Sequence, residues 1–265
     1  MPTMKYTNKS GKRVPSVTTV IGNLGWSSKA LMHWAWKLGM ESKDYREVRD
    51  IACDTGSYVH LAIECHIFGA PIPQEETDKV TFEDTVIADK GLEQYKILES
   101  DLALQCLESE LPLVSEEFNY GGCPDNIYEC DTRKIKVTVD NEAVASYLCS
   151  LGIEKPVLLN DTKSSKGIWP GNIIQLGAYN HLIRECTRYR PDGFLIVKFN
   201  KNVDDALNDK KMITFIPVPQ DLIDRGFEIF KHLLPIHKEK YQFEKAVSAL
   251  SGYIKKEEET EAKGI

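Results

Sequence analysis

Short apolar runs recur through the middle and second half of the chain, each bounded by proline, glycine or polar residues. Runs of four to eight such residues are typical of strands in a sheet. The pattern predicts strands at 113–120, 126–130, 134–139, 156–163, 194–199 and 212–218. The clearest is 156–163, in which apolar side chains give way to polar ones before Gly167.

Elsewhere, apolar residues return every three or four positions, which is the period of an amphipathic helix. This periodicity predicts helices at about 55–68, 80–109, 141–151, 170–188 and 219–250, the last interrupted near Pro235, and a helical region after Pro15. In that first region Trp26, Ala30, Trp34 and Leu38 are four apart, and we expect this stripe to lie in the core. Strands alternating with helices predict an α/β fold with a mixed central β-sheet flanked by helices.

Length and composition fit one globular unit. The 265 residues are 42% hydrophobic, which is enough for a sizeable core. We expect a single domain over residues 1–250, with 1–14 as an exposed arm or hairpin, and a charged, disordered tail at 251–265. No apolar run approaches the roughly 20 residues of a membrane span, and the start of the chain lacks a signal-peptide pattern. We therefore expect a cytoplasmic protein without a membrane partner.

Candidate chemistry gathers at the end of the 156–163 strand. Asp161 and Lys163 are two apart, so their side chains project from the same face of a strand. Asp125 follows Gly121 and Gly122 and precedes the 126–130 strand, and it would face Asp161 if the two strands pair. Two carboxylates bind Mg²⁺ or Mn²⁺ well, because hard cations prefer oxygen ligands and retain water. The sequence therefore predicts a metal centre there.

Other candidates surround these residues. His60 and Glu64 are four apart on one predicted helix, so both can face the metal, although a lone His60 would more often be a core histidine. Glu117, just upstream of Asp125, fits either the site or a solvated strand position. The residues after Lys163 suit contact with DNA: Ser164, Ser165 and Lys166 with phosphates, and Trp169 with a base. The first three would also fit a plain loop, and Trp169 would also fit a lid over the core.

The ordered set of motifs resembles a known family. The set comprises Gly-Ser-Tyr-Val-His ending at His60, Gly-Gly-Cys-Pro-Asp ending at Asp125, Leu-Leu-Asn-Asp-Thr-Lys ending at Lys163, and Gln-Leu-Gly-Ala-Tyr from Gln175 to Tyr179. In this order the motifs resemble the PD-(D/E)XK nuclease superfamily, and within it the RecB-like exonuclease branch that includes many phage-encoded proteins. The resemblance spans roughly residues 15–200.

The resemblance implies a restriction-endonuclease-like core and a Mg²⁺- or Mn²⁺-dependent exonuclease acting on linear DNA ends. His60, Asp125, Asp161 and the Thr162 carbonyl would hold the metal, and Lys163 would be catalytic. Gln175 and Tyr179 would order the site or contact DNA. It also implies phage-type recombination, repair or replication, and it leaves a partner protein and a homo-oligomer open. Some relatives carry an iron–sulfur cluster, which we do not expect because no cysteine follows Cys186.

Charge and cysteines narrow the alternatives. The net charge of −7 disfavours non-specific DNA binding, so we expect a local basic surface on an acidic body. Seven cysteines without a Cys-x-x-Cys spacing favour reduced thiols over a disulfide framework or a zinc site. Three rivals remain: an endonuclease, a non-catalytic nucleic-acid-binding or recombination accessory protein on the same fold, and a glycosidase using Asp125 and Asp161 without a metal.

Overall fold

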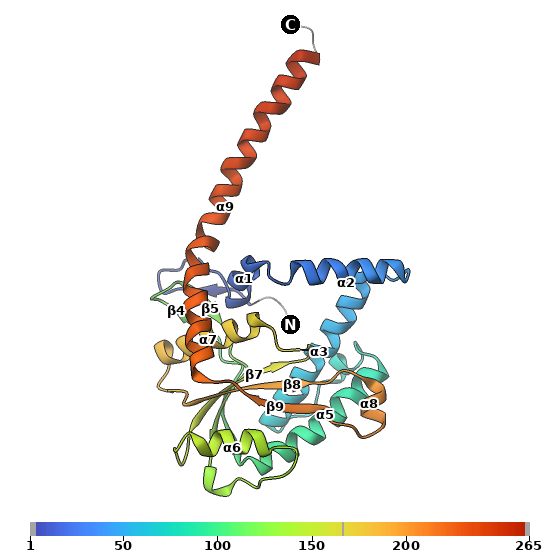
Figure 1. Ribbon diagram of the computed structural model, residues 1–265, viewed down its shortest axis with the longest axis vertical. Helices are drawn as coiled ribbons and strands as arrows, with labels where there is room; N and C mark the ends of the chain where they lie inside the picture. The colour runs from blue at the N-terminus through green and yellow to red at the C-terminus, as the bar shows by residue number, and fades with distance from the viewer. Residues whose placement is uncertain (1–3, 166, 263–265) are drawn as a thin grey trace.

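A five-stranded mixed sheet lies at the centre of the computed structural model, which describes residues 4–165 and 167–262. Its strands are β3 (Leu104–Ser109), β6 (Asn126–Cys130), β7 (Val157–Lys163), β8 (Gly193–Phe199) and β9 (Ile213–Pro217), in the order β3-β6-β7-β8-β9. Neighbours are antiparallel except β7 and β8, which are parallel and joined through a crossover helix (Figure 1). The predicted α/β fold with a mixed sheet flanked by helices is confirmed.

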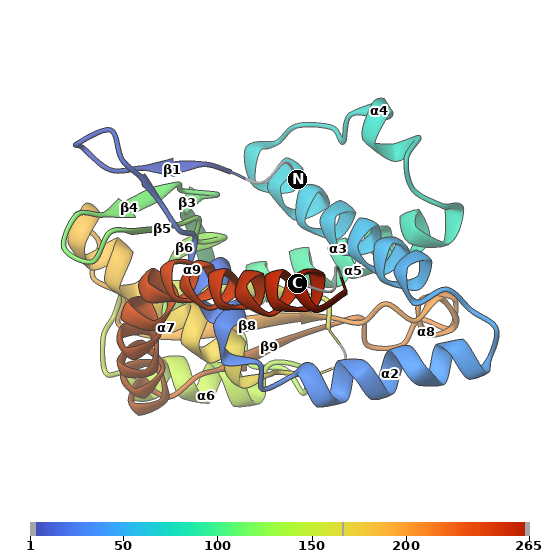
Figure 2. The same cartoon turned by 90° about the horizontal axis from the view of Figure 1, so that it is seen from above.

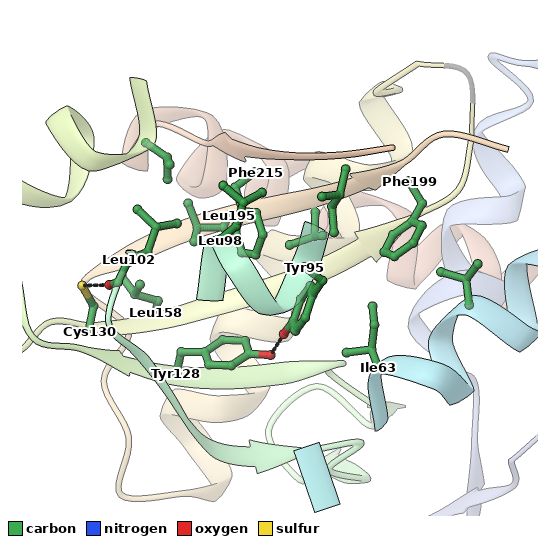
Figure 3. Packing of buried hydrophobic residues seen from close by; sticks show 14 of the residues in the cluster. Ile63, Tyr95, Leu98, Leu102, Tyr128, Cys130, Leu158, Leu195, Phe199 and Phe215 are labelled. Carbon is green, nitrogen blue, oxygen red and sulfur yellow. Dashed lines mark hydrogen bonds between the residues drawn. The ribbon is translucent and has the colours of Figure 1, made fainter. Parts of the chain in front are cut away.

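Two layers of helices cover the sheet. One face packs against α1 (Val17–Ile21), α7 (Pro170–Cys186) and the first part of α9 (Gln220–Ala262). The other packs against α3 (Tyr45–Phe68), α5 (Phe82–Asp101) and α6 (Glu142–Ser150). Strand alternation divides the core, because Leu158 points to the second layer and Leu159 to the first. Figure 3 shows the second core, where the hydroxyls of Tyr95 and Tyr128 are hydrogen-bonded to each other.

Small elements frame one end of the sheet. Residues 4–14 form a hairpin of β1 (Tyr6–Thr7) and β2 (Arg13–Val14), one of the two forms expected for this segment. A second hairpin joins β4 (Leu113–Ser115) to β5 (Tyr120–Gly122), so the single strand predicted at 113–120 is two short ones. The remaining short elements are α4 (Gln74–Thr77), α8 (Val203–Leu207) and the 3₁₀ turns η1 (Gly22–Leu24) and η2 (Thr132–Lys134).

Two predicted elements are wrong. The helix expected at 80–109 ends at Asp101, and the chain turns through Ala103, at φ 49°, into β3. Most β3 side chains are only partly buried, so apolar and polar residues alternate weakly along this strand. Its sequence therefore looked like a continuation of the preceding helix. The strand expected at 134–139 is irregular after η2, and Val137 and Val139 are exposed. Apolar and polar residues alternate in this segment, but it has no neighbouring strand to pair with and so does not form a strand in the described structure.

The helices also differ from expectation in extent. α3 begins at Tyr45, ten residues before its predicted start, with Asp44 as its N-cap. Of the stripe predicted to be core, Trp26 lies just before α2 (Ser28–Met40), and Ala30, Trp34 and Leu38 lie on it. Trp26 is exposed, and none of the 13 described positions of α2 is buried. α9 continues through Pro235, and it remains helical over 251–262, where a disordered tail was predicted, because Lys, Glu and Ala are strong helix formers. Among the helices that the structure describes, none is long and apolar enough to cross a membrane.

Candidate metal centre

Asp161 and Lys163 lie near the carboxyl end of β7 and point to the α7 side of the sheet. Asp161 has 0% of its side chain exposed, and Lys163 has 18%. The Lys163 Nζ lies 2.5 Å from Asp161 Oδ2, which is an ion pair. Among the described residues, however, neither Asp161 carboxylate oxygen has a partner with the directional geometry of a hydrogen bond. A fully buried carboxylate without hydrogen bonds is rare and indicates a missing ligand.

Asp125 reaches the same place from the next strand. β6 pairs antiparallel with β7 so that Asn126 lies opposite Asn160, and this register brings the residue before Asn126 beside the end of β7. The condition under which Asp125 was expected to face Asp161, that these two strands pair, is therefore met. The Thr162 backbone N–H donates to Asp125 Oδ2 at 2.6 Å and fixes that carboxylate. A role for the Thr162 carbonyl as a metal ligand stays a prediction.

Three side chains converge on a common point. His60, Glu110 and Asp125 each offer a ligand atom, and these atoms lie within 4.8 Å of one another. His60 comes from α3, where its Nδ1 lies 3.7 Å from Asp125 Oδ2. Glu110 follows β3, and its backbone N–H donates to the Asp125 carbonyl at 2.8 Å. Two carboxylates and one imidazole form a donor set suited to a divalent cation.

Glu110 is the member of this cluster that the sequence did not reveal. Burial, followed by the charge of Asp125, raises the pKa of Glu110 to about 7. Its backbone has φ 49°, a left-handed conformation that costs a non-glycine residue about 1–3 kcal/mol and often marks functional positions. A usable sequence signal was Glu108 and Glu110 at alternate positions before Pro112, which fits a strand ending at a site. The predicted 80–109 helix concealed it.

The electrostatics of the centre fit a bound cation. Burial raises the pKa of Asp161 above its usual range, outweighing the opposite effect of Lys163, and Asp125 raises it further. The negative charge of Asp161 also contributes to the raised pKa of Glu110. Clustered carboxylates with raised pKa values repel one another when ionised, and a divalent cation would relieve this repulsion. Together with the unpartnered Asp161 oxygens, this chemistry fits Mg²⁺ or Mn²⁺.

Gln175 and Tyr179 lie one helical turn apart on α7 and face the centre. The Gln175 Nε2 donates to the Tyr179 hydroxyl at 2.9 Å. Burial raises the pKa of Tyr179 well above its ordinary value, and the charges of Asp161 and Asp125 raise it further. A Cβ added to Gly122 would lie 2.6 Å from the Tyr179 ring, so glycine is needed there for the tyrosine to pack.

Two acids that the sequence left open are separated by the structure. Glu64 is close enough to the centre for its charge to raise the pKa of Glu110. Glu117, in the β4–β5 hairpin, instead joins His181 and Glu185 of α7 in a different cluster. Glu185 accepts the backbone N–H groups of Glu116 and Glu117, at 2.8 and 3.1 Å, so this second cluster caps a loop. The suggestion that Glu117 belongs to the metal site is not supported by its position.

The segment after β7 packs against α3. A Cβ added to Gly56 would lie 2.8 Å from Ser164 Oγ, so the glycine in the His60 motif allows this close approach. The Ser165 hydroxyl donates to the Gly167 carbonyl at 2.6 Å. Lys166 lies outside the described residues. Trp169 is 57% exposed at the start of α7, and its two interpretations, a base-stacking residue and a lid over the core, stay predictions.

Comparison with known proteins gives a distant structural similarity. No family model and no curated protein matches the chain. Among solved structures, the chain is similar to a protein from Eubacterium rectale described as "Putative exonuclease", with 11% sequence identity and a TM-score of 0.44. The alignment covers 70% of this chain and 66% of that one, just under two thirds of its length. The function is therefore argued from the centre itself.

Proposed function

We propose that the protein is a metal-dependent deoxyribonuclease that hydrolyses phosphodiester bonds. The observation that carries this proposal is the convergence of His60, Glu110 and Asp125 beside Asp161, a buried carboxylate without a hydrogen-bond partner in the described structure. The nearby Lys163 distinguishes this centre from a purely structural cation site, because it places a positive charge next to the acids. An enzyme that cleaves a charged diester needs such a charge in the transition state.

His60, Glu110, Asp125 and Asp161 would hold the cation. When bound, Mg²⁺ or Mn²⁺ would supply Lewis acidity and lower the pKa of a coordinated water. The chain's own groups orient this arrangement: the Thr162 N–H fixes Asp125, and the turn at Glu110 aims its carboxylate inward. A glycosidase with Asp125 and Asp161 as acid and base would have no use for the convergent His60 and Glu110.

Lys163 and Tyr179 would interact with the substrate phosphate or with the attacking water. Burial lowers the pKa of Lys163, but Asp161 and Asp125 more than offset that effect, so the ammonium stays charged near neutral pH. It can stabilise charge on a scissile phosphate, or on the attacking oxygen as a proton leaves. The raised pKa of Tyr179 keeps its hydroxyl protonated, and Gln175 orients it as a donor to a phosphate or a water.

The finer assignment is an exonuclease. The ordered motifs from His60 to Tyr179 resemble the exonuclease branch of the PD-(D/E)XK superfamily, and we propose a role in phage-type recombination, repair or replication on that basis. Productive binding at a DNA end also suits a chain of net charge −7, because loose binding along a duplex would be weak. An endonuclease on the same centre is the alternative.

Linear and covalently closed circular plasmid of equal mass, incubated with the protein and Mg²⁺, test both levels of the proposal. We expect progressive loss of the linear form, no loss in excess EDTA, and no turnover with Ca²⁺, whose looser coordination orients water poorly. Asp161→Asn protein is the control for contaminating nuclease. Equal loss of both forms would replace the exonuclease with an endonuclease. Activity that persists in EDTA would exclude the metal mechanism.

A further inference from the structure

The aromatic and aliphatic side chains of α2 lie in solvent. Trp36 is 61% exposed, Leu31, Met32 and Met40 are each more than half exposed, and Trp26, just before the helix, is 60% exposed. A helix with apolar residues around its whole circumference is normally buried. Exposed apolar surface of this extent on one element is a mark of an interaction site.

The charge of this part of the chain is opposite to that of the rest. The first 40 residues contain six of the 33 Lys and Arg residues and none of the 40 Asp and Glu residues. Two of these cations, Lys29 and Lys37, are exposed on α2 itself. These two lysines bring positive charge to the helix that carries the exposed aromatic side chains.

All four tryptophans of the chain lie outside the core, three of them on α2 or just before it and the fourth just before α7. Trp34 and Trp169 are 36% and 57% exposed. Trp169 directly precedes α7, and the start of α7 packs against α1. A Cβ added to Gly171 there would lie 3.5 Å from the Ile21 side chain of α1. Figures 1 and 2 show α2 running from α1 to the outer end of α3, the helix that carries His60. The C-terminal end of α2 therefore leads to the helix that holds His60, and its N-terminal end leads to α1, which packs against α7.

We propose that α2, together with Trp26 and Trp169, binds single-stranded nucleic acid. Bases stack on the exposed indoles, and Lys29 and Lys37 neutralise phosphates, so that a strand is held beside the metal centre. Sequence-tolerant stacking on aromatic side chains within a basic surface is the usual means of binding single strands, whose bases are free to stack. The proposed binding of single strands does not depend on nuclease activity, whereas delivery of the bound strand to a cleavage site rests on the proposed nuclease function.

Charge decides between this ligand and a second copy of the chain. The second copy would offer the projecting part of α9, which carries exposed Phe243, Val247 and Leu250. The segment with these exposed side chains, residues 236–250, has a net charge of +1, because it holds Lys238, Lys240 and Lys245 against Glu239 and Glu244. An acid-free α2 gains no charge complementarity from such a partner, whereas a polyanion matches it.

Intrinsic tryptophan fluorescence measures this surface directly, since every tryptophan lies on it. The intact protein is titrated with oligothymidylate in EDTA, so that no cleavage occurs, while a labelled oligonucleotide reports binding by anisotropy. We expect saturable quenching in parallel with the anisotropy change. Binding by anisotropy with unchanged tryptophan emission would overturn the proposal, as would an absence of binding at low salt.

Variants separate α2 from the second projecting helix. Trp26→Ala and Trp36→Ala should each weaken oligothymidylate binding by about 5- to 150-fold, the range expected for loss of one stacked base. Lys29→Ala with Lys37→Ala should also flatten the salt dependence of binding. Phe243→Ala, an equally exposed aromatic on α9, is the matched control and should bind normally. Since α2 has no buried side chain, these proteins should keep the parent circular dichroism spectrum and melting temperature.

Sedimentation velocity tests the competing occupant. If Trp36→Ala converts a dimer to a monomer and leaves DNA affinity unchanged, α2 is a self-interface and the proposal fails. If the parent protein cleaves no DNA but the tryptophan variants lose oligothymidylate binding, α2 is a strand-binding surface and the nuclease proposal fails. If the parent protein cleaves DNA and the tryptophan variants bind normally, the nuclease proposal holds and the α2 proposal fails.

Discussion

β7 and α2 invert the usual arrangement of side chains in opposite ways. In β7 the polar residues Asn160, Asp161 and Thr162 are buried, and Asp161 has 0% of its surface exposed. In α2 the apolar residues are exposed, with Trp36 at 61%. Burying a carboxylate and exposing an indole both cost stability relative to the alternative placement. Chains retain such positions where a ligand later compensates for the cost.

The two inversions differ in what would compensate them. The buried Asp161 of β7 lies near Asp125 and Glu110, and Lys163 supplies one positive charge to these three carboxyl groups. A small cation can balance the remaining negative charge. The exposed side chains of α2 lack a covering surface, which only a large ligand can provide. Substitutions in β7 should therefore change chemistry, and substitutions in α2 should change association. The following predictions test that division, from the largest expected effect to the smallest.

Lys163→Met should lower cleavage by at least about a hundredfold, corresponding to about 3 kcal/mol of transition-state stabilisation. Methionine keeps the apolar stem of the lysine, and Asp161 can take up a proton in the variant because burial already raises its pKa. Initial rates on linear DNA at saturating Mg²⁺ provide the measurement. Lys155→Ala, which removes an exposed ion pair with Glu129 just before β7, is the control. A folded Lys163→Met protein with parental activity would contradict the assigned role.

Glu110→Gln should reduce both Mn²⁺ affinity and cleavage by about tenfold or more, since even groups that only support metal ligands commonly contribute 10- to 100-fold. Titration calorimetry with Mn²⁺ gives the affinity. Glu117→Gln is the matched control, because Glu117 belongs to the loop-capping cluster with His181. Equal effects of the two substitutions would show that the convergence of His60, Glu110 and Asp125 does not bind the cation.

Gly177→Ala should lower the free energy of unfolding by about 1–3 kcal/mol, the usual cost of overpacking. A Cβ at Gly177 would lie 2.7 Å from both Ile223 O and Phe227 N, so the backbones of α7 and α9 would have to separate. Urea denaturation followed by circular dichroism measures the change. An unaltered midpoint would mean that the two helices are not in close backbone contact.

Gly39→Ala should leave unfolding unchanged or raise its free energy by up to about 1 kcal/mol, because alanine favours helix and a Cβ there meets no atom within 4 Å among the described residues. The same urea experiment tests it beside Gly177→Ala. A clear loss of stability would reveal that α2 packs against something in solution and would remove the contrast with β7.

The sequence was sufficient where local patterns coincide with tertiary burial. β6, β7 and β8 come from short apolar runs that the sheet buries almost entirely, and α7 is a largely buried helix. The chemistry of Asp161 and Lys163 follows from their spacing on one strand. The pairing that brings Asp125 to Asp161 was also within reach, because both lie at the ends of recognisable strands.

Other features depend on contacts that no local pattern encodes. Glu110 reaches the centre through backbone hydrogen bonding to Asp125, fifteen positions away, after a partly buried strand that resembled more helix. The exposure of α2 could not be predicted from Trp26, Ala30, Trp34 and Leu38, because an apolar stripe has the same sequence whether it faces a core or solvent. Periodicity specifies which residues share a face, whereas burial depends on the neighbours that the fold supplies.

The position of β7 as the third of five strands has a consequence for hydrogen exchange. Its backbone amides bond to β6 on one side and β8 on the other, so they should exchange with deuterium only when the sheet opens as a whole. The amides of α2, without a covering layer in the described structure, should exchange through local fraying. A nucleic-acid strand bound by the fluctuating α2 would thus reach carboxylates whose spacing hardly varies while the strand stays bound.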